Sequence, residues 1–173
     1  MLKLGPIHVN NNILDAIRNE QLVIFAGAGV SMGSPAHLPD FNKLANKIAE
    51  GSGLIIEENE PIDRFLGRLA HIGVKVSQRA IQLLSNPESA PTALHLSLMR
   101  LFRHSESVRL VTTNFDLHFE TAAQNIFGRE LDVFSAPALP LGRDFRGLVH
   151  VHGKLTHPSG MVLTDRGTVR IPT

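Results

Sequence analysis

Three clusters of polar residues and glycines follow short apolar stretches of this 173-residue chain. Gly27–Ser31 contains two glycines and a serine, and Thr112–Asp116 contains the amide of Asn114 and the carboxylate of Asp116. The imidazole of His152 follows a third apolar stretch. Glycines let the backbone turn tightly and approach bound phosphates, because no Cβ stands in the way. An imidazole titrates near neutral pH and can serve as a general base. These residue types predict a nucleotide site that also carries acid–base chemistry.

Each cluster also has a structural interpretation, which the sequence leaves open. Gly-x-Gly after a strand is a weak signal without the third glycine of the dinucleotide fingerprint. Asn114 is a favoured N-cap for the helix that follows it, and capping is compatible with a role in a site. His150 and His152, with His157 nearby, suggest a metal site, but there is no cysteine and no acidic residue close by. We therefore expect no metal, and a general base at His152 with room beside Gly153.

The three clusters fall where the strands of an α/β sheet would end. Apolar and β-branched stretches predict buried strands at residues 22–26, 108–113, 131–134, 148–151 and 161–163. Helical segments separate most of them, which predicts an α/β fold with a Rossmann-like, mainly parallel sheet flanked by helices. Ligands bind beyond the carboxyl ends of the strands in such sheets. We therefore expect the clusters to converge at one sheet edge.

Helical periodicity fills the rest of the chain. A short helix is predicted after Asn10–Asn12, and Asp40 is placed as the N-cap of a helix that ends before Gly51. Residues 54–90 are predicted to be a helical insertion. After Pro91 a further helix is expected to present one apolar face, made of Leu94, Leu98, Leu101 and Phe102.

Composition restricts the class of protein. With 43% hydrophobic residues the chain can form a core, and a net charge of +1 gives no electrostatic case for nucleic acid. The absence of cysteine excludes disulfides and every zinc site built on cysteine. Neither a signal peptide nor an apolar run long enough to span a membrane is visible. We expect a soluble, cytoplasmic protein.

Four motifs, taken in order, resemble the sirtuin family of NAD-consuming enzymes. They are Gly27-Ala28-Gly29-Val30-Ser31, Pro39-Asp40-Phe41, Thr112-Thr113-Asn114-Phe115-Asp116 and His152-Gly153. Sirtuins carry GAGxS, a PDF-type turn, TQN-x-D and HG in the same order. The TTN-x-D variant and the HVHGKL block look more like the bacterial sirtuin-like NAD hydrolases, many of which serve in antiphage defence. The resemblance covers roughly residues 22–163.

The resemblance implies a role for each motif. Residues implied to line the phosphates and ribose of NAD are Gly27, Ala28, Gly29 and Ser31. Asp40 and Phe41 would border the nicotinamide pocket, and Asp116 would hold the nicotinamide amide. Asn114 would position the attacking water or ribose, and His152 would be the general base acting through the nicotinamide ribose.

The function implied is NAD hydrolysis, which releases nicotinamide and ADP-ribose. NAD is the substrate and no metal is expected, because the cysteine zinc module of the sirtuin deacylases is absent. The alternatives are an NAD-dependent protein deacylase and a non-catalytic module that binds NAD or ADP-ribose. We expect one domain over residues 1–173, incomplete at its C-terminus because the family continues beyond the HG strand. A homo-oligomer or a regulatory partner chain would then complete or restrain it.

Overall fold

The computed structural model describes residues 2–4, 6–140 and 144–165. A short antiparallel hairpin comes first, made of β1 (Leu2–Leu4) and β2 (Ile7–Val9). Helix α1 (Asn11–Arg18) follows, and the Asn10 side chain caps it by accepting a hydrogen bond from the Asn12 N–H. The predicted helix after Asn10–Asn12 is therefore confirmed. None of the helices in the described part of the chain is long and apolar enough to cross a membrane.

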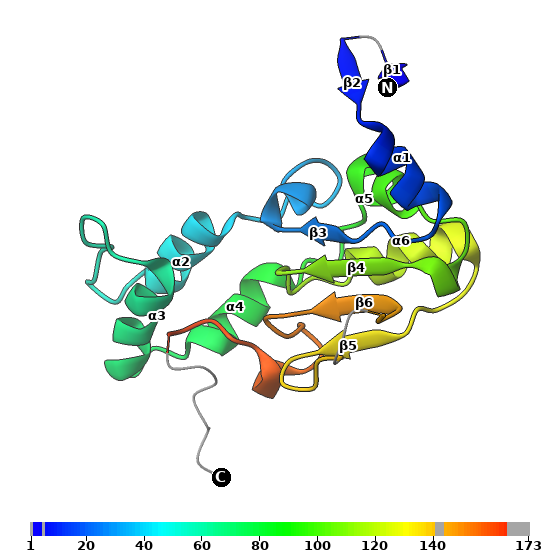
Figure 1. Ribbon diagram of the computed structural model, residues 1–173. Coiled ribbons are helices and arrows are strands. Elements are labelled where there is room, and N and C mark those ends of the chain that lie inside the picture. Colours follow the sequence, from blue (N-terminus) through cyan, green and yellow to red (C-terminus); the bar gives the residue numbers. More distant parts are fainter. Residues whose placement is uncertain (1, 5, 141–143, 166–173) are drawn as a thin grey trace.

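The centre of the protein is a parallel sheet of four strands in the order β3-β4-β6-β5. Its strands are β3 (Ile24–Ala26), β4 (Arg109–Thr112), β5 (Val133–Ser135) and β6 (Gly147–His150). All four run in one direction, so that their carboxyl ends share one edge (Figure 1). The α/β fold with a parallel sheet flanked by helices is confirmed.

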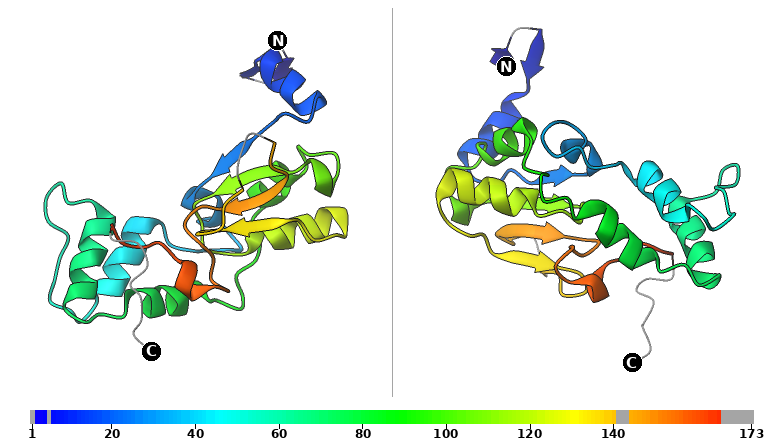
Figure 2. Two further views of the ribbon diagram at one scale, coloured as in Figure 1. Left: turned by 60° about the horizontal axis from the view of Figure 1, so that its bottom comes forward. Right: turned by 180° about the vertical axis from the view of Figure 1, so that it is seen from behind.

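Two helices pack on one face of this sheet and bury its first core. They are α5 (Ala93–Met99) and α6 (His118–Phe127), and in the view from behind α6 lies in front of the sheet (Figure 2). Leu110 and Leu148 of the sheet pack in one cluster with Phe119 of α6. Gly128 ends α6 with a left-handed φ of 63°, a conformation that favours glycine.

Three further helices lie beyond the carboxyl ends of the strands and form a second core. They are α2 (Phe41–Ala49), α3 (Ile62–His71) and α4 (Val76–Leu84), the last two within the residues predicted to be helical (Figure 1). Asp40 caps α2 as predicted, with its carboxylate 2.8 Å from the Lys43 N–H. The cluster extends to Phe115, Met161 and Leu163, which tie these helices to the sheet edge.

Three details of the sequence prediction were wrong. The stretch 22–26 was expected to be buried, but β3 is an edge strand, and alternation leaves the Phe25 side chain 79% exposed. Of the apolar face expected after Pro91, Leu98 and Phe102 pack in the first core, but Leu94 and Leu101 are exposed and His95 and Met99 are buried in their place.

The fifth predicted strand, at residues 161–163, is also absent. The 3₁₀ turn η3 (Pro158–Gly160) leads instead into an irregular segment. Met161 and Leu163 pack with the helices of the second core, and the Val162 N–H donates to the His152 carbonyl. Their apolar character therefore reflects burial against helices and not membership of the sheet.

Candidate functional site

A cavity of about 250 Å³ lies between the carboxyl edge of the sheet and α2. The loop after β3, the loop after β4 and the residue His152 beyond β6 form one wall, and α2 with the end of α4 forms the other. Its lining residues are Ala28, Ser31, Leu38, Pro39, Phe41, Leu44, Leu84, Thr113, Asn114, Phe115, Asp116 and His152. Six of the nine residues predicted for the site are in this lining. Gly27, Gly29 and Asp40 are not, although each adjoins a residue that is.

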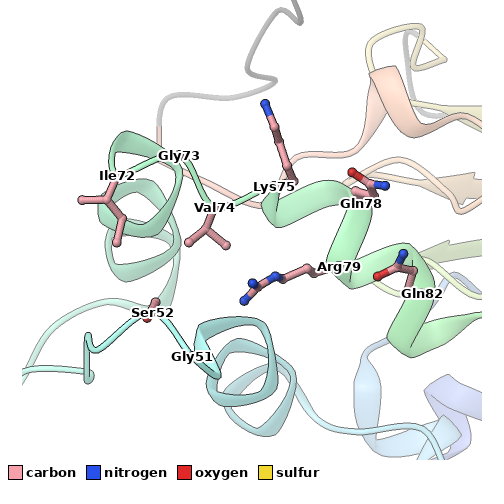
Figure 3. A pocket seen from close by; sticks show the side chains of 9 residues that line it. All are labelled: Gly51, Ser52, Ile72, Gly73, Val74, Lys75, Gln78, Arg79 and Gln82. Carbon is pink, nitrogen blue, oxygen red and sulfur yellow. The ribbon is translucent and has the colours of Figure 1, made fainter.

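A larger hollow, of about 520 Å³, lies elsewhere on the helical part (Figure 3). It is formed by the end of α2, the turn between α3 and α4, and one side of α4, and none of the predicted site residues lines it. Its Arg79 side chain turns toward the end of α2, where it donates to the carbonyls of Ile48 and Glu50. The Arg79 contacts explain its position by helix capping.

Ser31 is the centre of a buried hydrogen-bond network beside the cavity. Its side chain follows β3 in the 3₁₀ turn η1 (Ala28–Ser31) and is 2% exposed. The Ser31 hydroxyl donates to the Asp116 carboxylate at 2.9 Å and accepts from the Asn114 side-chain amide at 3.0 Å. His95 Nε2 lies 3.3 Å from the same oxygen. Ser31 therefore holds Asn114 and Asp116 in place, in addition to the ligand role that the resemblance implies.

His95 completes this network as a neutral donor. The Thr92 N–H donates to His95 Nδ1 at 3.1 Å, so the ring proton resides on Nε2 and points to Ser31. The His95 side chain is fully buried, and burial lowers its pKa from 6.5 to about 4. The negative charge of Asp116 opposes this shift and His118 adds to it, but burial is the largest cause.

Asn114 is held at three of its polar groups. Its N–H donates to the Thr112 hydroxyl at 3.1 Å, its side-chain amide donates to Ser31, and its carbonyl lies 2.9 Å from His150 Nδ1. The structure gives its side-chain oxygen Oδ1 no partner among the described residues. Because Asn114 lines the cavity, Oδ1 is the group that can accept a hydrogen bond from a bound molecule.

The two histidines of the H-x-H pattern lie in different environments. The strand ends at His150, which is fully buried, whereas His152 belongs to the following turn, is exposed and lines the cavity. The structure gives the His152 imidazole no hydrogen-bond partner among the described residues, and its ring centre lies 6.5 Å from that of Phe115. Across the described ranges there is no group of three or more His, Cys, Asp or Glu side chains placed to hold a metal ion.

The glycines of the site differ in whether the surrounding atoms leave space for a Cβ. A Cβ at Gly29 would meet no atom within 4 Å, and one at Gly27 would make only ordinary contact with Thr113. Neither position is required by packing, so the space above Gly29 is free for a ligand. Gly153 was expected to leave room beside His152, but that space is filled, because a Cβ there would lie 2.3 Å from the Gly160 carbonyl oxygen.

Sequence reasoning missed two histidines and one glutamate of this site. His95, His150 and Glu120 were not among the predicted site residues, although the Glu120 carboxylate lies 3.1 Å from His150 Nε2. A capping box joins Thr92 to His95, but the sequence signature of this motif has Glu or Gln at the position of the histidine. The contact of His95 with Ser31, 64 residues away, has no local signal.

Comparison with known families adds a match to the C-terminal part of the chain. The family described as the SIR2-like domain matches residues 108–170. The match contains the Thr112–Asp116 cluster and His152. It begins at residue 108, so it does not include Gly27–Ser31. No match was found among the curated proteins. The match supports a sirtuin-like family and, in a general sense, an NAD-related function.

Proposed function

We propose that the protein hydrolyses NAD at the bond between nicotinamide and ribose. The observation that carries this proposal is the cavity, which gathers Ser31, Asn114, Asp116 and His152 from three separate strand ends. The match of the chain to the SIR2-like domain over residues 108–170 supports NAD as the ligand. The cavity lies below the roughly 300–1,000 Å³ typical of small-molecule pockets. It therefore suits one end of a dinucleotide, the nicotinamide riboside half.

The cavity walls fit the two parts of that half. Leu38, Leu44 and Leu84 provide an apolar wall for the flat nicotinamide ring, opposite the polar wall at the strand ends. Asp116 lies at the polar wall, where a carboxylate can accept a hydrogen bond from the carboxamide of the ring. The open space above Gly29 adjoins the same edge and lets phosphates approach the backbone closely.

The reaction breaks the bond between ribose C1′ and the nicotinamide nitrogen. The bonding electron pair leaves with nicotinamide, which becomes neutral, and positive charge develops on the ribose. Water then forms a bond to C1′ and loses one proton, so NAD⁺ and water give nicotinamide, ADP-ribose and a proton. Asn114 Oδ1 orients this water by accepting a hydrogen bond from it, and the His152 imidazole takes up the proton that the water loses.

Nicotinamide release from NAD, followed by chromatography, tests these roles. Asn114→Ala and His152→Ala should each lower the rate by about 100-fold or more, within the range for loss of an oriented general base or nucleophile. His71→Gln, on the exposed end of α3, is the matched control and should keep the wild-type rate. Equal rates for wild type and His152→Ala would contradict the mechanism, and NAD binding without turnover would indicate a binding module instead.

We also propose a cellular role for this activity. The resemblance to bacterial sirtuin-like NAD hydrolases supports a cytoplasmic role in antiphage defence, with a second copy or a regulatory partner that restrains the loss of NAD. Expression in a phage-sensitive bacterium would test this role. The wild-type chain should reduce phage plating and lower cellular NAD during infection, while the His152→Ala chain should do neither.

A further inference from the structure

A fully buried histidine joins three elements of the sheet edge behind the cavity. His150 ends β6 with a side chain that is 0% exposed. Its Nδ1 lies 2.9 Å from the Asn114 carbonyl oxygen, just beyond β4, and its Nε2 lies 3.1 Å from Glu120 Oε1 on α6. His150 does not line the cavity, so it has no direct contact with a molecule bound there.

The Asn114 carbonyl depends on His150 for its hydrogen bond. Neighbouring carbonyls are paired with backbone donors, since the Val151 N–H donates to Thr112 and the Leu155 N–H donates to Phe115. In the described part of the chain, His150 Nδ1 is the partner that the structure gives to the Asn114 carbonyl. Asn114 is only 7% exposed, and a buried carbonyl without a donor is unfavourable.

The chemistry of the three groups determines where the protons are. A backbone carbonyl can only accept a hydrogen bond, and an ionised carboxylate can only accept as well. Because acceptors face both ring nitrogens of His150, both hydrogen bonds form when the Glu120–His150 pair carries two protons. Two forms of the pair meet this condition with no net charge, an imidazolium beside a carboxylate and a carboxylic acid that donates to Nε2, and both keep the proton on Nδ1.

We propose that Glu120 and His150 are a positioning pair for catalysis, which keeps a proton on His150 Nδ1 for the Asn114 carbonyl. The pair sets the backbone at Asn114, and thereby the direction of the Asn114 Oδ1 that meets the attacking water. The inference rests on the proposed function, because it assigns the pair to the orientation of that water. A displacement of about 1 Å at such a group is enough to lower a rate by about 100-fold.

Two substitutions of His150 separate positioning from packing. In His150→Asn, the side-chain amide takes the place of Nδ1 and still donates to the Asn114 carbonyl, but the contact with Glu120 is lost. In His150→Gln, the amide reaches the place of Nε2 and keeps Glu120 while the Asn114 carbonyl loses its donor. Glutamine fills the histidine volume better than asparagine, so a packing role predicts the opposite order.

The expected result is a kcat for His150→Gln about 10- to 100-fold below that of His150→Asn, with KM for NAD little changed. Glu120→Gln should resemble His150→Asn, since a glutamine amide can donate to Nε2 while Nδ1 keeps its proton. His71→Gln serves as the control. A His150→Gln enzyme as active as His150→Asn would overturn the proposal, as would a change confined to KM.

A second readout does not depend on turnover. The ¹⁵N signals of the His150 ring should show a protonated Nδ1, with the assignment made from their loss in His150→Asn. The side-chain amide signal of Asn114, assigned by its loss in Asn114→Asp, should stay in place in His150→Asn and move in His150→Gln. A wild-type chain without turnover but with these spectra would refute NAD hydrolysis and retain the positioning of Asn114. A neutral His150 ring with no proton on Nδ1 would overturn the proposal itself.

Discussion

The neutral, buried His95 predicts a specific loss of stability in mild acid. Burial lowers the pKa of His95 from 6.5 to about 4 in the folded protein, while in the unfolded chain the pKa returns to 6.5. Between these values the unfolded chain binds a proton at His95 that the folded protein does not bind. The stabilisation from neutral His95 is therefore present above pH 6.5, declines as the pH falls, and is fully lost only below pH 4.

The size of this loss follows from the two pKa values. Between pH 7.5 and pH 5, preferential protonation of the unfolded chain at His95 lowers the free energy of unfolding by about 2 kcal/mol. The charge of Asp116 and the neighbouring His118 are already included in the folded value, since they are the other causes of the shift.

Urea unfolding of wild type and His95→Gln at pH 7.5, 6, 5 and 4.5 tests the reasoning. A glutamine amide can both donate and accept hydrogen bonds but does not titrate, and every other histidine is common to both proteins. Wild type should lose about 2 kcal/mol more than His95→Gln between pH 7.5 and pH 5. Parallel losses in the two proteins would refute the assignment of a neutral, proton-excluding His95.

Four further substitutions test other parts of the site and the sheet. Ser31→Ala removes the oxygen shared by Asn114, Asp116 and His95, and should lower the free energy of unfolding by about 2–4 kcal/mol in urea, since buried partners are left unpaired. Gly29→Ala should leave thermal stability unchanged or slightly raised, because its Cβ meets no protein atom, while calorimetry should show weaker NAD binding. Phe25→Ala should lower the free energy of unfolding by less than about 0.5 kcal/mol, whereas Phe119→Ala should lower it by about 3–5 kcal/mol. The reason is that Phe25 is 79% exposed and Phe119 only 1%. Similar losses for the two substitutions would contradict the position of β3 at the sheet edge.

Much of the fold was accessible from local patterns. Apolar stretches located the four strands of the sheet, and Asp40 marked the start of α2 as observed. These signals are local, because capping and periodicity act within a few residues. The convergence of polar clusters also followed from a general rule, since parallel strands place their carboxyl ends at one edge.

The remaining features depend on contacts between distant parts of the chain. The exposure of Phe25 follows from the place of β3 in the sheet, which the apolar run 22–26 does not specify. The same holds for His95, which meets Ser31 across 64 residues, and for His150, which meets Glu120 across 30. No local pattern distinguishes either histidine from the other histidines of the chain, and only their partners do so.

Product analysis of the wild-type chain with NAD as the sole substrate tests the central claim most directly. With no acylated peptide present, the proposed hydrolysis predicts that nicotinamide and ADP-ribose appear together in equal amounts, with water as the acceptor of the ribose. Chromatography of the reaction over time would measure both products. Unchanged NAD, or nicotinamide release that requires an acyl-lysine peptide, would contradict NAD hydrolysis at this cavity.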